Sequence, residues 1–285
     1  MAEPLQTLAY AKINLVLEVL GRRDDGYHEI DTILQEVEVA DEVSVAPATG
    51  WAVTVSGPRA EGVPLDDTNL ALRAAKLLAG RVGGAPVAIH LEKHIPAAGG
   101  LGGGASDAVA VLKLLSRLWP GVTSGDMAAV AAEVGSDEAF FLVGGTARAR
   151  GRGERITPLP AFARHDVVLF VPGASIERKT ARMFSALGSL RFDDGAVAEA
   201  FAAAPPHLVT MEATFNAFER VAFDLFPWLA TLWEKLEESS GEHVRLCGAG
   251  PCLFWIGPAG RGELVARKAA GLDCQVILTQ TVNRP

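Results

Sequence analysis

The spacing of hydrophobic positions indicates β-strands in the first hundred residues of the chain. Apolar and polar residues alternate there, as between Leu15 and Val19 and between Pro86 and Glu92. Such alternation places the apolar side chains on one face of a strand. Aliphatic residues indicate further short strands around Ile30, Val37, Val39, Val43, Val45, Val53 and Val55. Breaks between these strands are expected at Asp41 and Pro47, because acidic residues and proline are uncommon inside strands.

Helical spacing dominates several later segments. Apolar residues recur at a helical period from Ser106 to Trp119, and a second helix is expected from Ser124 to Val134, stopped by Gly135. One helix is also expected in the first half. It begins after Asn69, a residue suited to the N-cap, and runs through Ala79 to an end at Gly80.

The second half begins with a polar, proline-containing stretch from Gly151 to Asp166, which is typical of a domain junction. We expect a strand at Val167–Val171 and then helices between Arg178 and Glu238. Breaks in these helices are expected at Pro205-Pro206 and at Pro227. The chain is then expected to end with a strand, a glycine turn at residues 248–251, a second strand, a helix and a last strand at residues 275–279. This order indicates an α+β protein rather than a βαβ repeat.

Composition and charge narrow the possible partners. The 285 residues are 49% hydrophobic and 21% charged, which suits one large globular domain or two smaller ones. Acidic residues outnumber basic ones by 34 to 26, for a net charge of −8. Nucleic acids and anionic membranes require a basic face, so neither is an expected partner. Any phosphate must therefore be bound by a local site and not by the overall charge of the protein.

The expected location is the cytoplasm. The chain starts without a basic cluster or an apolar signal core, and no apolar run reaches the ~20 residues of a membrane helix. An odd number of cysteines, Cys247, Cys252 and Cys274, suits buried thiols in a reducing compartment. His243 lies near two of them, but the spacing is wrong for a zinc knuckle, and we predict no metal-binding residues.

The strongest chemical signal is a glycine-rich segment between a predicted strand and a predicted helix. Five of the six residues from Gly99 to Gly104 are glycine. Bare backbone amides and the positive end of the following helix suit a phosphate. A flexible linker is the alternative, but Pro96 and an amphipathic helix bound the segment tightly. We predict that it binds phosphate.

Other known patterns match this region less well. The Walker pattern fails because Ala105 replaces its lysine, and the dinucleotide pattern fits only weakly and lacks a parallel βαβ unit. A hydrolase elbow would need Ser106 directly after a strand, whereas about a dozen residues follow Glu92. His90 and His94 suggest a metalloprotease, but they lie on a predicted strand and not on a helix.

Four ordered blocks of sequence resemble the GHMP kinase superfamily. The glycine segment is similar to that superfamily's ATP loop, Pro-x-x-x-Gly-Leu-Gly-Ser/Gly-Ser-Ser. The other blocks are Ala11–Leu15, Arg23–His28 and Gly135–Phe141, and the turn at Gly248–Gly250 fits the third motif of the superfamily. The resemblance extends from residue 9 to residue 254. The hairpin block resembles one branch, whose members phosphorylate an erythritol unit that carries a cytidyl diphosphate.

The resemblance implies an α+β fold with two domains and an active site in the cleft between them. The N-terminal domain, residues 1–157, would hold a mixed sheet with helices and the ATP loop. The C-terminal domain, residues 158–285, would be a ferredoxin-like α/β domain. The implied reaction transfers the γ-phosphoryl group of ATP, with Mg²⁺, to the 2-hydroxyl of the cytidyl substrate, in the mevalonate-independent route to isoprenoids. The expected partner is this small molecule, and the expected state is a monomer or weak homodimer.

The resemblance also assigns roles to residues. Asp137 would take the proton of the hydroxyl, and Lys12 would keep that carboxylate ionised and stabilise the developing charge. Without the resemblance, Lys12 is interpreted as an edge lysine and Asp137 as a helix-end cap. Residues implied to contact ATP are Pro96, Ala97, Ala98, Gly99, Gly100, Leu101, Gly102, Gly103, Gly104, Ala105 and Ser106. Ser106 could instead cap its helix.

For the cytidyl substrate, the resemblance implies Tyr27 as a stacking ring and His28 as a hydrogen-bonding edge. Their alternative is aromatic packing at a hairpin tip. Asn14 would order the substrate end of the site, and Thr180 would approach a substrate phosphate.

The chain departs from the family pattern at Tyr10, Ala98, Ala105, Glu138-Ala139 and Ala249. We expect Glu138 to face away from the site.

Three rival functions are weighed against this prediction. A mevalonate, phosphomevalonate or homoserine kinase is disfavoured by Gly26-Tyr27-His28, because those acceptors carry no cytosine. A non-catalytic ligand sensor on the same fold would not need Lys12 and Asp137. A reductase rests only on the weak dinucleotide pattern.

Overall fold

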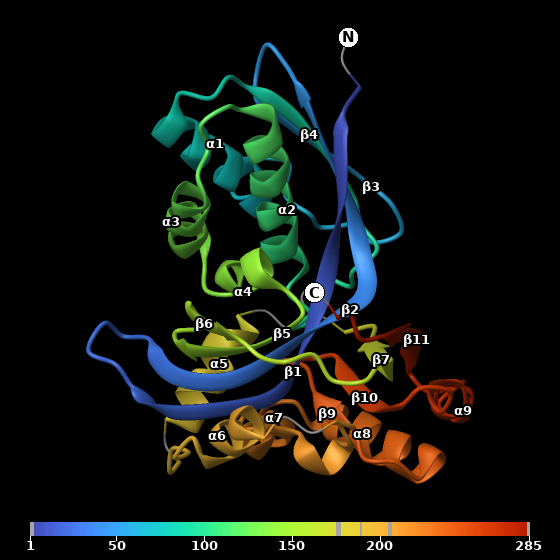
Figure 1. Ribbon diagram of the computed structural model, residues 1–285. Helices are drawn as coiled ribbons and strands as arrows, with labels where there is room; N and C mark the ends of the chain where they lie inside the picture. Colours follow the sequence, from blue (N-terminus) through green and yellow to red (C-terminus); the bar gives the residue numbers. More distant parts are fainter. Residues whose placement is uncertain (1–2, 98, 175–177, 189, 205–206, 284–285) are drawn as a thin grey trace. The chain divides into compact units, whose positions relative to one another are not determined.

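Figure 1 shows a computed structural model of the chain, which describes residues 3–97, 99–174, 178–188, 190–204 and 207–283. The chain forms two compact units, each assembled from separate segments. Unit 1 comprises Met1–Ala11, Val39–Ala97 and Gly102–Val143, and unit 2 comprises Lys12–Glu38, Ala98–Leu101 and Gly144–Pro285. The long strands β1 (Leu5–Arg22) and β2 (His28–Pro47) each contribute residues to both units.

Unit 1 has a sheet with helices packed on one face. Its end of β2 pairs antiparallel with β4 (Val87–Glu92), and β4 pairs in parallel with β3 (Ala52–Ser56). The helices are α1 (Leu70–Val82), α2 (Gly103–Leu118), α3 (Ser124–Val134) and α4 (Glu138–Val143). Figure 1 shows α1, α2 and α3 together on one side of β3 and β4. The alternating residues of the strands and the apolar faces of the helices form one hydrophobic core.

The predicted helices of unit 1 are present, with two corrections at their ends. Asn69 caps α1, because its side chain accepts from the amides of Ala71 and Leu72. The end predicted at Gly80 is wrong: the helix continues to Val82 and stops at Gly83, whose φ of 74° is left-handed. Similarly, α2 begins at Gly103 rather than at Ser106, because the left-handed Gly102 is its N-cap.

One predicted strand break is wrong. The strand β2 runs through Asp41 without interruption and ends, as predicted, at Pro47. The carboxylate of Asp41 is fully buried, yet it accepts hydrogen bonds from the amides of His94 and Ile95 and forms an ion pair with Lys93. Because its charge is satisfied, an acidic residue is tolerated inside this strand.

Unit 2 contains an antiparallel sheet with the order β11-β7-β10-β9. Its strands are β7 (His165–Pro172), β9 (Arg245–Leu246), β10 (Leu253–Pro258) and β11 (Cys274–Gln280). All eight residues of β7 are buried. Its helical elements are α5 (Lys179–Leu187), α6 (Ala196–Ala203), η1 (Met211–Ala213), α7 (Glu219–Leu225), α8 (Pro227–Ser240) and α9 (Gly262–Lys268). The break predicted at Pro205-Pro206 lies outside the described residues.

The remaining strands of unit 2 are β5 (Thr146–Gly151), β6 (Arg155–Pro158) and β8 (Phe215–Asn216). In this unit, β2 pairs with β5, β5 pairs with β6, and β1 pairs with β8. The polar stretch predicted as a junction thus includes the strand β6, and the domain boundary at residue 157 stays a prediction. No helix in the described part of the chain has both the length and the apolar run that crossing a membrane needs.

Candidate active site

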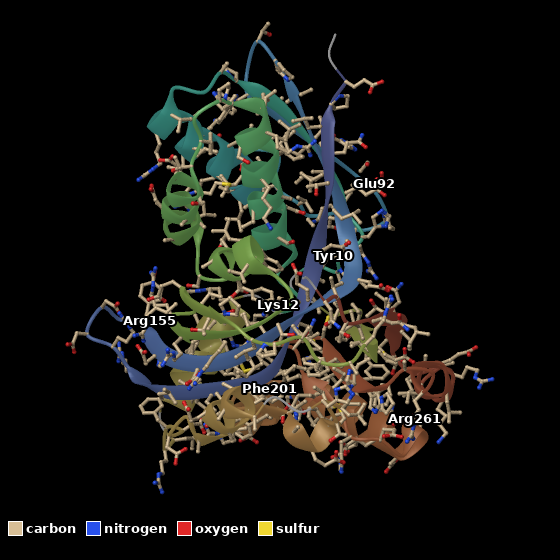
Figure 2. All side chains as sticks on the ribbon, viewed as in Figure 1. Tyr10, Lys12, Glu92, Arg155, Phe201 and Arg261 are labelled. Atoms are coloured by element: carbon tan, nitrogen blue, oxygen red, sulfur yellow. The ribbon has the colours of Figure 1, made fainter. Side chains whose placement is uncertain are left out.

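Lys12, which is labelled in Figure 2, lies on β1. Its ammonium group is held by a series of hydrogen bonds between buried polar side chains. Its Nζ donates to Oδ1 of Asn14 over 2.8 Å, and Nδ2 of Asn14 donates to Oγ1 of Thr32 over 2.9 Å. The hydroxyl of Thr32 donates to the carbonyl of Val16 over 2.6 Å. All three side chains belong to residues that are at most 4% exposed. These hydrogen bonds fix the direction of the buried Lys12 side chain, so the edge-lysine interpretation is wrong.

The first part of the glycine segment lies against the glycine turn at residues 248–251. A Cβ on Gly100 would stand 2.1 Å from the carbonyl oxygen of Cys247, and its φ of 87° is left-handed. A Cβ on Gly99 would stand 2.4 Å from Sγ of Cys252. Both glycines are therefore required by packing of the protein on itself. The carbonyl of Leu101 also accepts from the amide of Lys12 over 2.9 Å, which ties the segment to β1.

The glycine turn itself lies over the Lys12 side chain. A Cβ on Gly248 would be 3.2 Å from Oδ1 of Asn14 and 3.5 Å from Nζ of Lys12. Asn216 holds the turn, because its Nδ2 donates to the carbonyls of Leu246 and Gly248 over 2.7 and 2.9 Å. Three sequence blocks that are far apart in the chain therefore meet within unit 2: the β1 block, the start of the glycine segment and the third motif.

Thr180 is the second residue of α5 and is exposed. Its neighbour Lys179 donates from Nζ to the carbonyl of Gly250, so the start of this helix contacts the glycine turn.

The thiol of Cys247 is fully buried beside these groups. Burial raises its pKa well above the usual value and nearby Cys252 raises it further, while Lys12 and Lys179 lower it. The thiol is therefore neutral and does not compete for the charge of Lys12. Cys252 is buried as expected, whereas Cys274 is only half-buried because it begins the edge strand β11.

The second part of the glycine segment forms the start of α2 in unit 1. Gly102 takes a φ of 75°, and among the described residues this N-cap position has no side-chain cap hydrogen bond. The first turn includes the exposed Gly104. The cap interpretation of Ser106 is wrong, because Ser106 lies inside α2 and its amide donates to the carbonyl of Gly102 over 2.9 Å. Amides at a helix start suit an anion, and phosphate binding by this segment stays a prediction. Ala98 lies outside the described residues.

Asp137 is half-buried and lies immediately before α4 in unit 1, where its carbonyl accepts from the amide of Phe140 over 3.2 Å. The next residue, Glu138, is 2% exposed, and its carboxylate folds back to within 2.5 Å of the position that a Cβ on Gly135 would take. Burial raises the pKa of Glu138 to about 7, and the charge of Asp137 contributes in the same direction. Lys12 and Asp137 lie in different units, so the contact between them stays a prediction.

The hairpin between β1 and β2 carries an aromatic cluster in unit 2. The ring of His28 stacks on Phe184 with centroids 4.4 Å apart and planes at 17°, and Phe192 meets it edge-on at 6.3 Å. Tyr27 is 52% exposed, and the guanidinium of Arg152 lies 4.7 Å from the centre of its ring. Burial, helped by Arg22, lowers the pKa of His28, so its imidazole is neutral at pH 7.

Sequence reasoning missed Thr32, Phe184 and Asn216. The first two have no local signal: a threonine inside a strand and a phenylalanine on a short helix are ordinary residues until the fold brings them to Asn14 and His28. Asn216 lies in a two-residue strand, and only the pairing of that strand with β1 indicates its place.

Comparisons with known proteins identify the family. Profiles of the N-terminal and C-terminal domains of GHMP kinases match residues 69–145 and 198–271. The chain is 39% identical over 256 residues to the 4-diphosphocytidyl-2-C-methyl-D-erythritol kinase of Dehalococcoides mccartyi, which covers 88% of this chain and 89% of the relative. It is 34% identical over 286 residues to the enzyme of that name from Pelotomaculum thermopropionicum, with 98% of each chain covered.

Solved structures agree with this result. A crystal structure of a 4-(cytidine 5'-diphospho)-2C-methyl-D-erythritol kinase matches with a TM-score of 0.79 and 32% identity, over 98% of this chain and 100% of that one. A homoserine kinase from Cytophaga hutchinsonii matches with a TM-score of 0.74 but 16% identity, over 99% and 96% of the two chains, which shows the shared fold alone. The predicted two-domain α+β fold is confirmed. The chain belongs to the GHMP kinases and, within them, to the 4-diphosphocytidyl-2-C-methyl-D-erythritol kinase family.

Proposed function

We propose that the protein transfers the γ-phosphoryl group of ATP to the 2-hydroxyl of 4-diphosphocytidyl-2-C-methyl-D-erythritol. The proposal is supported by sequence identity to kinases of that name over most of the chain. The structural observation that carries it is the buried ammonium of Lys12, held by Asn14 beside the glycine turn and joined through its backbone to the glycine segment. Phosphoryl transfer depends mainly on positioning and charge neutralisation, and this arrangement supplies both.

In this mechanism Asp137 accepts the proton of the substrate hydroxyl as it attacks the γ-phosphorus. Lys12 stabilises the charge that develops on the transferring group. The hydrogen bonds through Asn14 and Thr32 hold the ammonium in one direction, so little reorganisation is needed when charge develops. The neutral thiol of Cys247 leaves that charge available to the phosphoryl group.

The glycine segment binds the phosphates of ATP through backbone amides at the start of α2. In the described part of the chain, no group of three or more His, Cys, Asp or Glu side chains could hold a metal ion by itself. Mg²⁺ typically keeps several waters and binds through substrate phosphates with one or two protein ligands, so these residues fit an ion that arrives with ATP. When bound, Mg²⁺ would neutralise phosphate charge, and the hydroxyl of Ser106 would contact a phosphate oxygen or the ion.

The hairpin recognises cytosine. A neutral imidazole has one donor nitrogen and one acceptor nitrogen that point in different directions, so one of them would hydrogen-bond a single polar group of cytosine. Phe184 fixes the plane of His28 by stacking, and the exposed ring of Tyr27 provides a surface for the base. Asn14 and Thr180 would contact the erythritol and phosphate parts of the substrate. The cytoplasmic location and the monomer or weak homodimer stay predictions.

The reaction is tested by incubating the purified protein with Mg-ATP and, separately, the cytidyl substrate, mevalonate and homoserine. We expect ADP release with the cytidyl substrate alone. Release with mevalonate or homoserine but not with the cytidyl substrate would contradict the proposal.

The role of the glycine segment is tested by Gly104→Glu. Gly104 is exposed, its φ is not left-handed, and among the described residues a Cβ there would meet only Leu70, at 3.4 Å. The variant should fold, and its carboxylate should repel the phosphates and weaken ATP binding by about tenfold or more. Gly80→Glu, on the exposed side of α1 with open space around it, is the matched control. Equal ATP affinity in both variants would exclude the segment as the phosphate site.

A further inference from the structure

A buried ion cluster joins the two ends of the glycine segment within unit 1. Lys93 directly follows Glu92, the last residue of β4, which is labelled in Figure 2. Its ammonium forms ion pairs with the carboxylates of Asp41, on β2, and Asp107, on α2. The three side chains are 6%, 0% and 3% exposed. Lys93 lies just before the glycine segment and Asp107 just after it, so the pair between them closes a loop of the chain.

The same cluster fixes the backbone that enters the segment. Oδ1 of Asp41 accepts from the amides of His94 and Ile95 over 2.5 and 2.8 Å, immediately before Pro96. The amide of Lys93 donates to the carbonyl of Ser56 over 2.8 Å, and its carbonyl accepts from Arg59 over 3.0 Å. The strand end is therefore held both by β3 and by the buried carboxylate of Asp41.

The two ends of the segment also pack on each other. A Cβ on Gly103 would lie 3.1 Å from Cγ2 of Ile95 and 3.6 Å from Oδ2 of Asp41. The side chain of Ile95 and the first turn of α2 are thus in close contact beside the carboxylate of Asp41. A shift of either end would disturb the other, because there is no space between them for adjustment.

The charges of the cluster do not balance when all three groups are ionised. Two carboxylates face one ammonium, and Oδ1 of Asp107 is buried with no hydrogen-bond partner among the described residues. Burial raises the pKa of Asp107 to about 7; the Lys93 ammonium lowers it and the Asp41 carboxylate raises it. Such a cluster is costly to bury and contributes little net stability compared with apolar residues of similar size. Its placement under the glycine segment suggests another role.

We propose that Lys93, held between Asp41 and Asp107, is a positioning residue for ATP, which ties the strand entering the glycine segment to the helix leaving it. The tie keeps the amides at the start of α2 aligned before ATP arrives, so that binding does not have to order the segment. This inference rests on the proposed binding of ATP phosphates by that segment.

The test compares Lys93→Met and Lys93→Arg with wild type by calorimetry and hydrogen exchange. We expect Lys93→Met to raise the Kd of ATP by about tenfold or more and leave the Kd of the cytidyl substrate unchanged. Amide exchange should accelerate across residues 95–106, and Lys93→Arg should recover part of the affinity. Lys76→Met, which removes a lysine from a surface ion pair with Asp67, is the control and should bind ATP normally.

Lys93→Met leaves two buried carboxylates unpaired and could fail to fold. The triple variant Lys93→Met/Asp41→Asn/Asp107→Asn replaces every charged group of the cluster with a neutral side chain of similar size. It therefore tests the same link between the entering strand and α2 without leaving buried carboxylates unpaired. A folded triple variant with wild-type ATP affinity and wild-type exchange across the segment would overturn the proposal. The Gly104→Glu variant separates the two proposals: if it weakens ATP binding while the Lys93 variants do not, only the positioning role fails.

Discussion

The Nζ of Lys12 lies 2.8 Å from Oδ1 of Asn14, and this contact gives the ammonium its direction. Lys12→Met should reduce turnover by about 1,000-fold or more, because the charge on the transferring phosphoryl group loses its closest proposed partner. Asn14→Leu keeps the ammonium but removes its acceptor, so the expected loss is smaller, about 10- to 100-fold. Single-turnover kinetics with calorimetric ATP binding checks both, and ATP affinity should stay within about threefold of wild type. Equal losses in the two variants would contradict a positioning role for Asn14.

The general base is tested by Asp137→Asn. The amide cannot accept the hydroxyl proton, so turnover should fall by about 1,000-fold or more while both substrates still bind. Asp126→Asn is a suitable control, because Asp126 completes the capping box of α3 with Thr123. A turnover near that of wild type in Asp137→Asn would show that another group takes the proton.

How far the sequence predicts this site depends on the kind of contact involved. The order of the motifs was sufficient to predict the kinase fold through the family resemblance, whereas phosphate binding by the glycine segment, which was inferred from local backbone chemistry, stays a prediction. The end of α1 was wrong because Gly80 and Gly83 are both plausible stops, and only the left-handed φ of Gly83 decides between them.

Contacts between distant residues could not be predicted in this way. The break expected at Asp41 was wrong because its partners, Lys93 and the amides of His94 and Ile95, lie 52 to 54 residues further along the chain. The stacking of Phe184 on His28 could not be predicted for the same reason, because the two residues are far apart in the sequence. Two glycines of the segment, Gly99 and Gly100, were interpreted through phosphate binding alone, whereas the structure also gives them a packing role against the third motif.

Gly100 is predicted to be the least tolerant glycine of the segment. Gly100→Ala would place a Cβ 2.1 Å from the carbonyl of Cys247 on a backbone with a φ of 87°, so both sterics and conformation oppose it. We expect a loss of about 2–4 kcal/mol in the free energy of unfolding. Gly104→Ala, which meets no atom of the described residues closer than 3.4 Å, should change it by no more than about 1 kcal/mol. Urea denaturation of the two variants measures this difference, and equal stability would show that the contact with Cys247 is relieved by movement of the glycine turn.

The aromatic cluster should control the affinity for the cytidyl substrate and not that for ATP. His28→Ala removes the hydrogen-bonding edge and should raise the KM of the cytidyl substrate by about 10- to 100-fold. Phe184→Leu keeps an apolar side chain but removes the stacking ring, so a smaller rise of about three- to tenfold is expected. Steady-state kinetics with each substrate varied in turn distinguishes the two effects. If the KM of ATP rose while the KM of the cytidyl substrate did not change, the cytosine would have to bind at another site.

Glu138 should affect stability at neutral pH more than catalysis. Its folded pKa of about 7 lies above the ordinary value of 4.5, so between these values the folded protein keeps a proton that the unfolded chain has released. The contribution of Glu138 to stability is therefore fully present below about pH 4.5 and is lost as the pH rises through about 7. Glu138→Gln cannot ionise and should become more stable relative to wild type across this window, by roughly 1–3 kcal/mol. Turnover should stay within about twofold, because the carboxylate folds back over Gly135.

Thermal and urea unfolding at about pH 5 and about pH 8 tests the Glu138 prediction. Glu133→Gln, at an exposed position on α3, controls for the loss of one negative charge and should show no such pH dependence. If Glu138→Gln gains no stability over wild type between the two pH values, the carboxylate must be ionised at neutral pH. It would then lie beside Asp137 as a second negative charge, and a large change in turnover for Glu138→Gln would follow, because the proton affinity of the proposed base would depend on it.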